Sequence, residues 1–104
     1  MTSKAPVRLR QWQETRQPSI TDIERLFAEE GLRPTSWSNG PGDRYGEHSH
    51  GYEKVLYCAR GSIVFHAGGK DYELAAGDRL EIDQGTAHSA TVGDQGVTCL
   101  EASR

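Results

Sequence analysis

The pattern of hydrophobic and polar residues changes its period about one third of the way along the chain. Residues 7–12 (VRLRQW) alternate between polar and apolar and predict an N-terminal strand. Residues 22–30 predict a short amphipathic helix, because three apolar residues recur there at helical spacing: Ile23, Leu26 and Phe27. Thr21 and Glu24 have the spacing of a capping box, and Gly31 stands where a helix commonly ends. We expect this helix to cover one end of the domain.

From Arg33 onward the pattern is that of extended chain, broken by turn sequences such as NGPGD, AGGK and GDQG. The expected strands are 33–38, 44–50, 54–59, 62–67, 71–74, 79–82, 87–92 and 97–102. Many short strands at this spacing predict an all-β sandwich or barrel. We expect one domain over residues 1–104, with the N-terminal strand and helix in 1–32 and the barrel in 33–102.

The composition excludes several classes of partner. A net charge of −3 argues against a nucleic-acid-binding surface, which is normally basic. No apolar run approaches the roughly 18 residues that a membrane-spanning helix needs, and the N-terminal residues lack the apolar core of a secretory signal. We therefore expect a soluble cytoplasmic protein that binds neither nucleic acid nor membrane. Cys58 and Cys99 each lie in an apolar run and are expected to be small buried hydrophobic residues.

The histidines carry the strongest chemical signal. His48 and His50 are two residues apart, so that in a strand their side chains leave the same face. His88 lies in the predicted strand 87–92, which an antiparallel barrel can bring beside the pair. Neutral imidazoles suit Fe, Mn, Ni, Cu or Zn, and three of them leave coordination positions open. The residues thus predict a site for one divalent transition metal, although His-x-His also occurs on ordinary surface strands.

Glycines at fixed distances from these histidines resemble the two motifs of the cupin family. Residues 42–61 (GDRYGEHSHGYEKVLYCARG) resemble the first motif, in which a glycine precedes His-x-His by five residues and another closes the motif. Residues 77–88 (GDRLEIDQGTAH) resemble the second motif. The resemblance implies a double-stranded β-helix, or jelly-roll barrel, whose interior holds His48, His50 and His88.

The chain departs from the cupin motifs at three positions. Lys54 stands where the family carries a glutamate, Asp83 replaces the usual proline and Val92 replaces the usual asparagine. Glu53 is one residue too early, and a shift of one residue turns a strand side chain to the opposite face. Of the usual metal ligands, only the three histidines remain.

Lys54 poses an electrostatic problem. An ammonium about 4 Å from a divalent ion is repelled by about 8 kcal/mol at an effective dielectric constant of about 20. Four alternatives are open: the lysine is neutral; it pairs with Glu53, Glu81 or Glu101; the strand bulges so that Glu53 enters the site; or no metal binds and an organic anion lies between Lys54 and the histidines.

The resemblance implies a metal-dependent enzyme acting on a small organic molecule, because three-histidine sites are similar to those of cupin dioxygenases. In this interpretation Lys54 is catalytic and neutralises a substrate anion, while Tyr45 and Tyr52 contribute to binding. Isomerisation or decarboxylation of a small oxyacid is a further possibility. The alternatives are a module that binds or senses a small molecule or metal without turnover, and a degenerate barrel without metal. Small cupins commonly form homodimers, for which residues 7–12 are a candidate contact.

Overall fold

The computed structural model describes residues 5–104, so the first four residues of the expected domain lie outside the described part. The described chain forms one helix and seven strands. In chain order they are β1 (Val7–Arg10), α1 (Ile20–Glu29), β2 (Thr35–Asn39), β3 (Arg44–His48), β4 (Lys54–Ala67), β5 (Lys70–Ala75), β6 (Arg79–Ile82) and β7 (His88–Ser103). This is the all-β architecture with one short N-terminal helix that the sequence predicts. The helix does not meet the length and hydrophobicity needed to cross a membrane, and it is the only helix in residues 5–104.

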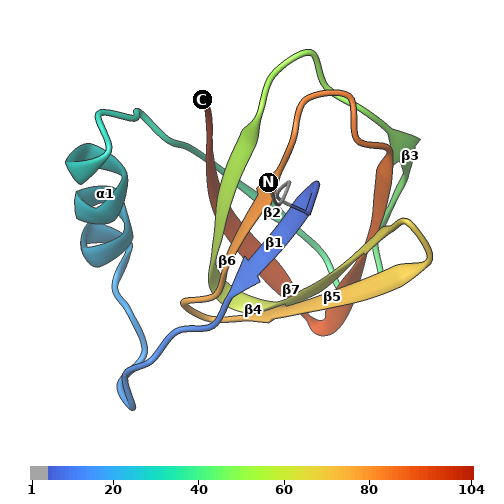
Figure 1. Cartoon of the computed structure of the whole chain (residues 1–104). Coiled ribbons are helices and arrows are strands. Elements are labelled where there is room, and N and C mark those ends of the chain that lie inside the picture. Colours follow the sequence, from blue (N-terminus) through green and yellow to red (C-terminus); the bar gives the residue numbers. More distant parts are fainter. Residues whose placement is uncertain (1–4) are drawn as a thin grey trace.

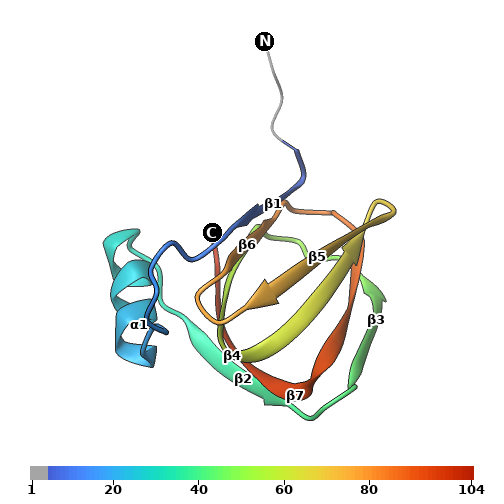
Figure 2. The same ribbon diagram turned by 90° about the horizontal axis from the view of Figure 1, so that it is seen from below.

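Two long bent strands, β4 and β7, hold the barrel together (Figures 1 and 2). They pair with each other in antiparallel fashion along most of their length. The first half of β4 also pairs with β6, and the second half of β7 pairs with β2. Beyond the bend, β4 pairs with β5 and the first half of β7 pairs with β3. The result is a barrel of two curved layers, the jelly-roll form of the double-stranded β-helix.

The strands β4 and β7 are continuous through their bends, so the boundaries predicted within them are wrong. Residues 54–59 and 62–67 are one strand rather than two. The predicted strands 87–92 and 97–102 both lie in β7, which begins at His88, one residue later than predicted. The glycine-rich sequences between them turn the strands without interrupting the ladder, which shifts register there. The predicted strand 44–50 is too long, because β3 ends at His48.

Gly61 makes the bend of β4 possible. Its φ of +73° lies in the left-handed region that favours glycine. A Cβ atom on this residue would lie 2.0 Å from the carbonyl oxygen of Gly96 on β7, so the two strands approach closely only because no side chain is present. The glycine that closes the first motif therefore has a structural reason to be there.

The helix is capped two residues earlier than predicted. Ser19 is the N-cap: its Oγ accepts a hydrogen bond from the Asp22 amide at 3.0 Å, and the Asp22 carboxylate accepts one from the Ser19 amide at 2.9 Å. The predicted capping box of Thr21 and Glu24 is wrong, because Ser19 and Asp22 have the same spacing and form it instead. Gly31 follows the helix with a φ of +72°, as predicted for its C-terminal end.

The helix covers the outside of the barrel. Ile23 and Phe27 are completely buried against outward-facing residues of β4 and β7. These are Val55, Tyr57, Ala59, Leu100 and Ala102. The alternate residues of the same strands face the barrel interior, where Cys58 and Cys99 lie opposite each other as fully buried free thiols. The strand period thereby assigns one face of β4 and β7 to the helix and the other to the interior.

An ionic network on the outside of the barrel links β1, β6 and Arg104, the residue that follows β7. Glu81 on β6 lies within 3.3 Å of the guanidinium groups of Arg8, Arg79 and Arg104. Arg104 also binds Glu53 at 2.8 Å. Burial opposes ionisation of Glu81, but hydrogen bonds from Arg79 and Arg8 outweigh it and lower the pKa of this carboxyl to about 2.

Candidate metal centre

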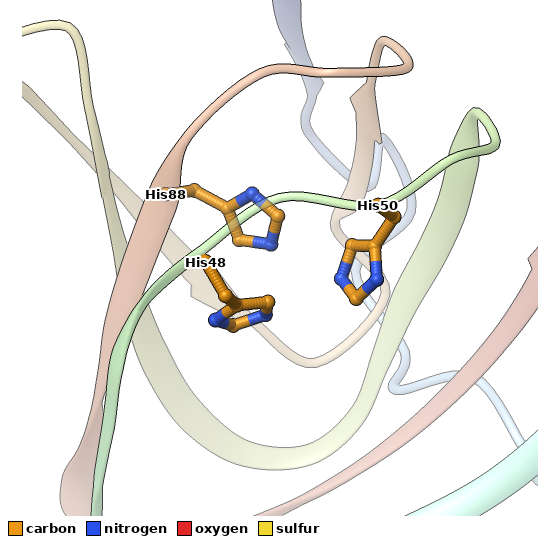
Figure 3. Close-up of side chains that lie close together, drawn as sticks. All are labelled: His48, His50 and His88. Carbon is orange, nitrogen blue, oxygen red and sulfur yellow. The ribbon is translucent and has the colours of Figure 1, made fainter.

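Three histidines converge inside one end of the barrel (Figure 3). His48 at the end of β3 lies directly opposite His88 at the start of β7, and His50 follows β3 in the next loop. The ring centroids are separated by 4.4 to 5.2 Å. One nitrogen from each ring lies within 4.8 Å of the others, a spacing from which the three side chains can hold one metal ion.

The loop that carries His50 is held by the second motif. The Gly85 amide donates a hydrogen bond of 2.9 Å to the His50 carbonyl, and Gly85 has a φ of +79°. The strand β3 changes register between Tyr45 and His48 just before this loop. His50 thus reaches the cluster although the extended strand predicted to carry it has already ended.

Backbone carbonyls fix the tautomers of two rings. His48 Nδ1 lies 2.7 Å from the Gly46 oxygen, and His88 Nδ1 lies 2.9 Å from the Thr86 oxygen. Because a carbonyl oxygen only accepts hydrogen bonds, Nδ1 is the protonated nitrogen in each ring, and Nε2 keeps its lone pair. This is the arrangement by which proteins orient histidines that ligate metals.

The cluster leaves polar atoms without partners. His50 Nε2 and His88 Nε2 are both buried and form no hydrogen bond. Such atoms normally cost about 1 to 3 kcal/mol each. Burial lowers the pKa of His88, and burial together with the Lys54 ammonium lowers the pKa of His50, so both rings favour the neutral form that binds metal. The donor set therefore fits a divalent transition metal.

The histidines form part of the wall of a cavity of about 300 Å³. Its other lining residues are Trp37, Tyr45, Lys54, Phe65, Ala90 and Glu101. One part of the wall is aromatic, and another carries an ammonium and a carboxylate beside the imidazoles. A volume of this order suits a small organic molecule.

Lys54 faces the cavity and pairs with Glu101. Its residue surface is 7% exposed, and Nζ lies 3.3 Å from Glu101 Oε1. This pairing is one of the four sequence alternatives. Glu53 points to the outside, where Arg104 and Arg8 bind it, so the alternative in which a bulge brings Glu53 into the site is wrong. Glu81 is likewise bound to arginines outside the cavity.

The two tyrosines lie in different places. Tyr45 lines the cavity and donates a hydrogen bond to the Asn39 side chain. Tyr52 is absent from the cavity wall; it stacks on the His50 ring at 4.9 Å and is 36% exposed. The fourth histidine, His66, binds Asp71 and Thr91 away from the cluster, in line with its absence from the motifs.

Sequence reasoning missed Phe65 and Ala90, and it named Glu101 only as one of three partners for Lys54. For Glu101 the reason lies in β7, whose inward-facing residues change from even to odd positions along the strand. Ala90 and Val92 face the core before the glycine-rich bend, and Val97 and Cys99 face it afterwards. A simple count of alternate residues from His88 would therefore have placed Glu101 on the outside.

Comparisons with known proteins agree with this architecture. Residues 37–102 match the sequence model of the cupin domain, so the chain belongs to the cupin family. An oxalate-binding protein from Thermotoga maritima is 40% identical over 78 residues, which are 74% of this chain. The chain spans 57% of the length of that curated relative.

Solved structures share the fold. A cupin superfamily protein from Desulfitobacterium hafniense aligns with 99% of this chain and 81% of its own, at a TM-score of 0.63 and 12% identity. The DMSP lyase DddQ from Ruegeria pomeroyi aligns over 70% of this chain and 38% of its own, at a TM-score of 0.65 and 23% identity. At these identities the likeness concerns the fold alone, and it agrees with the predicted jelly-roll barrel.

Proposed function

We propose that this cupin holds one divalent transition metal through His48, His50 and His88. The observation that carries the proposal is the pair of buried, unpartnered Nε2 atoms of His50 and His88, which lie in a cluster with the third imidazole. An ion there would satisfy these atoms, and Fe, Mn, Ni, Cu and Zn all suit such a donor set.

We further propose that the pocket binds a small organic acid. A divalent ion, when bound, supplies Lewis acidity and open coordination positions for ligand oxygens. Lys54 and Glu101 cancel in charge, and the imidazoles are neutral, so the loaded pocket carries about two positive charges and suits a small dianion. The relative named as an oxalate-binding protein supports this class of ligand.

Three residues in or beside the pocket then have definite tasks. The Lys54 ammonium has three donor hydrogens, of which Glu101 takes one, so it can also donate to a ligand carboxylate. Tyr45 forms part of the wall and limits the length of the ligand. Tyr52 packs on the outer side of His50 and holds the ring in place.

A second function in the same pocket is turnover of the bound acid. The Glu101 carboxylate in the cavity wall favours it, because this group is a proton acceptor beside the ligand space. In that case Lys54 neutralises the substrate anion, and the reaction is a dioxygenation, an isomerisation or a decarboxylation. Oxygen uptake and loss of substrate by the iron-loaded protein, measured with small thiols, diketones and oxyacids, separate turnover from binding alone.

The binding proposal is tested by calorimetric titration of oxalate into the Mn²⁺-loaded chain and into the same chain treated with a chelator. We expect binding only to the loaded form, and a loss of at least about tenfold in affinity for Lys54→Met, since one charge-assisted contact disappears. Lys70→Met is the matched control, because Lys70 does not line the cavity. Equal affinity in the loaded and metal-free forms would contradict the proposal.

A further inference from the structure

The buried Lys54 and the partly buried Glu101 form an ion pair at the edge of the proposed metal site. Residues 55, 57 and 59 of β4 face the helix, so residues 54, 56 and 58 face the barrel interior. Glu101 on β7 is the pairing partner of Leu56. Both charged side chains line the cavity, with 9% and 20% of their side-chain surfaces exposed. The pair therefore lies on the interior face, where water screens charge weakly.

Trp37 fixes the carboxylate of this pair. Its indole Nε1 donates a hydrogen bond of 2.7 Å to Glu101 Oε1, the same oxygen that lies 3.3 Å from Lys54 Nζ. Trp37 lies on β2, which pairs with β7 on the side away from β4. Glu101 is thus held between two strands and directed toward Lys54.

Glu101 is also the only carboxylate among the described residues that line the cavity. Glu53 and Glu81 are bound by arginines on the outside of the barrel. The positive charge of Lys54 therefore has one local counter-charge, and it comes from β7 rather than from the motif that contains the lysine.

We infer that Glu101 cancels the charge of Lys54 and so allows a lysine to occupy the position of a carboxylate ligand next to a metal. This inference rests on the proposed metal site. An isolated ammonium repels a nearby cation in proportion to the inverse of their distance, whereas the field of an ion pair falls off more steeply. Glu101 is therefore a positioning residue, which acts on the metal through Lys54.

A double-mutant cycle tests this inference by calorimetric titration of Zn²⁺ into four metal-free proteins. They are the wild type, Glu101→Gln, Lys54→Met and the double variant. The glutamine keeps the volume of Glu101 and an oxygen that accepts from Trp37, but it removes the charge. We expect Glu101→Gln to weaken Zn²⁺ binding by at least about tenfold. Lys54→Met should tighten binding, because the carboxylate is then unopposed.

The double variant decides between an indirect and a direct role of Glu101. We expect it to bind Zn²⁺ within about threefold of the wild type, because the loss of Lys54 removes the charge that Glu101 cancels. A double variant that binds Zn²⁺ as weakly as Glu101→Gln alone, or an unchanged affinity of Glu101→Gln, would overturn the inference. If Glu101→Gln does not fold, the Zn²⁺ affinity of Lys54→Met is the test. In that case an affinity no higher than that of the wild type overturns the inference.

The same experiment separates this inference from the proposed function. Wild-type protein that binds no Zn²⁺ contradicts both. Wild-type protein that binds Zn²⁺ and loses it in His88→Ala, but in which Lys54→Met does not restore binding to Glu101→Gln, supports the metal site and overturns only the charge compensation.

Discussion

At the scale of single residues, the site is defined by what replaces the fourth ligand of the family. Lys54 stands at the position of the cupin glutamate and faces the cavity, as its place in the first motif predicts. Its ammonium is paired with a carboxylate that the motif does not contain. In the proposed function, this exchange replaces a metal ligand by a donor for anions and leaves the three imidazoles as the donor set.

Lys54→Glu tests this exchange directly. We expect the variant to bind Zn²⁺ at least about tenfold more tightly than the wild type, because it restores a carboxylate beside the histidines. We also expect the metal-free variant to be about 1 to 3 kcal/mol less stable, because two carboxylates then face each other in a buried position. Calorimetry and urea unfolding measure the two effects. Unchanged metal affinity would mean that Lys54 does not act on the site.

At the scale of the elements, the continuity of β4 and β7 sets the shape of the pocket. Each strand passes from one layer of the barrel to the other, and its two halves pair with different neighbours. The close contact of Gly61 with Gly96 occurs at the bend. A change there moves the strand that carries Lys54 relative to the strand that carries Glu101 and His88.

Gly61→Ala is expected to destabilise the protein by more than about 3 kcal/mol, because it adds a backbone clash to an unfavourable positive φ. Gly68→Ala is the control. Gly68 also has a positive φ, of +58°, but nothing lies within 4 Å of its added Cβ, so we expect a loss of about 1 kcal/mol. Urea unfolding measures both. Equal losses would show that the contact with Gly96 is unimportant.

The sequence predicts the elements better than it predicts their connections. Helical spacing and strand alternation locate the helix and most strand segments, because these patterns are local. Whether a glycine ends a strand or bends it depends on pairing with distant residues. For this reason the sequence predicts two separate strands in place of β4 and two in place of β7. The histidine cluster follows from motif spacing, but the place of Glu101 in the pocket depends on the parity change in β7, which local sequence does not reveal.

At the scale of the whole molecule, the arginine–carboxylate network joins segments from both ends of the chain. Arg8 on β1 and Arg104 after β7 meet Glu81 on β6, and Glu30 at the end of the helix binds Arg79 and Arg104. This network lies outside the cavity and holds Glu53 and Glu81 away from the histidine cluster. It also connects the stability of the protein to pH.

We expect stability to fall in acid as Glu81 becomes protonated. The folded-state pKa of about 2 lies below the ordinary value of 4.5, so the stabilising effect is complete above about pH 5 and is lost as the pH falls toward 2. After allowance for solvent screening, this group contributes about 1 to 2 kcal/mol. Urea unfolding of the wild type and Glu81→Gln between pH 7 and 2.5 measures it. The proposed role is wrong if the two proteins show the same pH dependence.

The most direct test of the central claim is the metal content of the chain. The protein is purified without an affinity tag or chelator, supplied in turn with Fe, Mn, Ni, Cu and Zn, and analysed by mass spectrometry of the elements. We predict one ion per chain in the wild type and in His66→Ala, whose histidine lies outside the cluster, and less than about a tenth of an ion in His88→Ala. A wild-type chain that retains none of the five metals, or a His88→Ala variant that retains a full equivalent, would contradict the account.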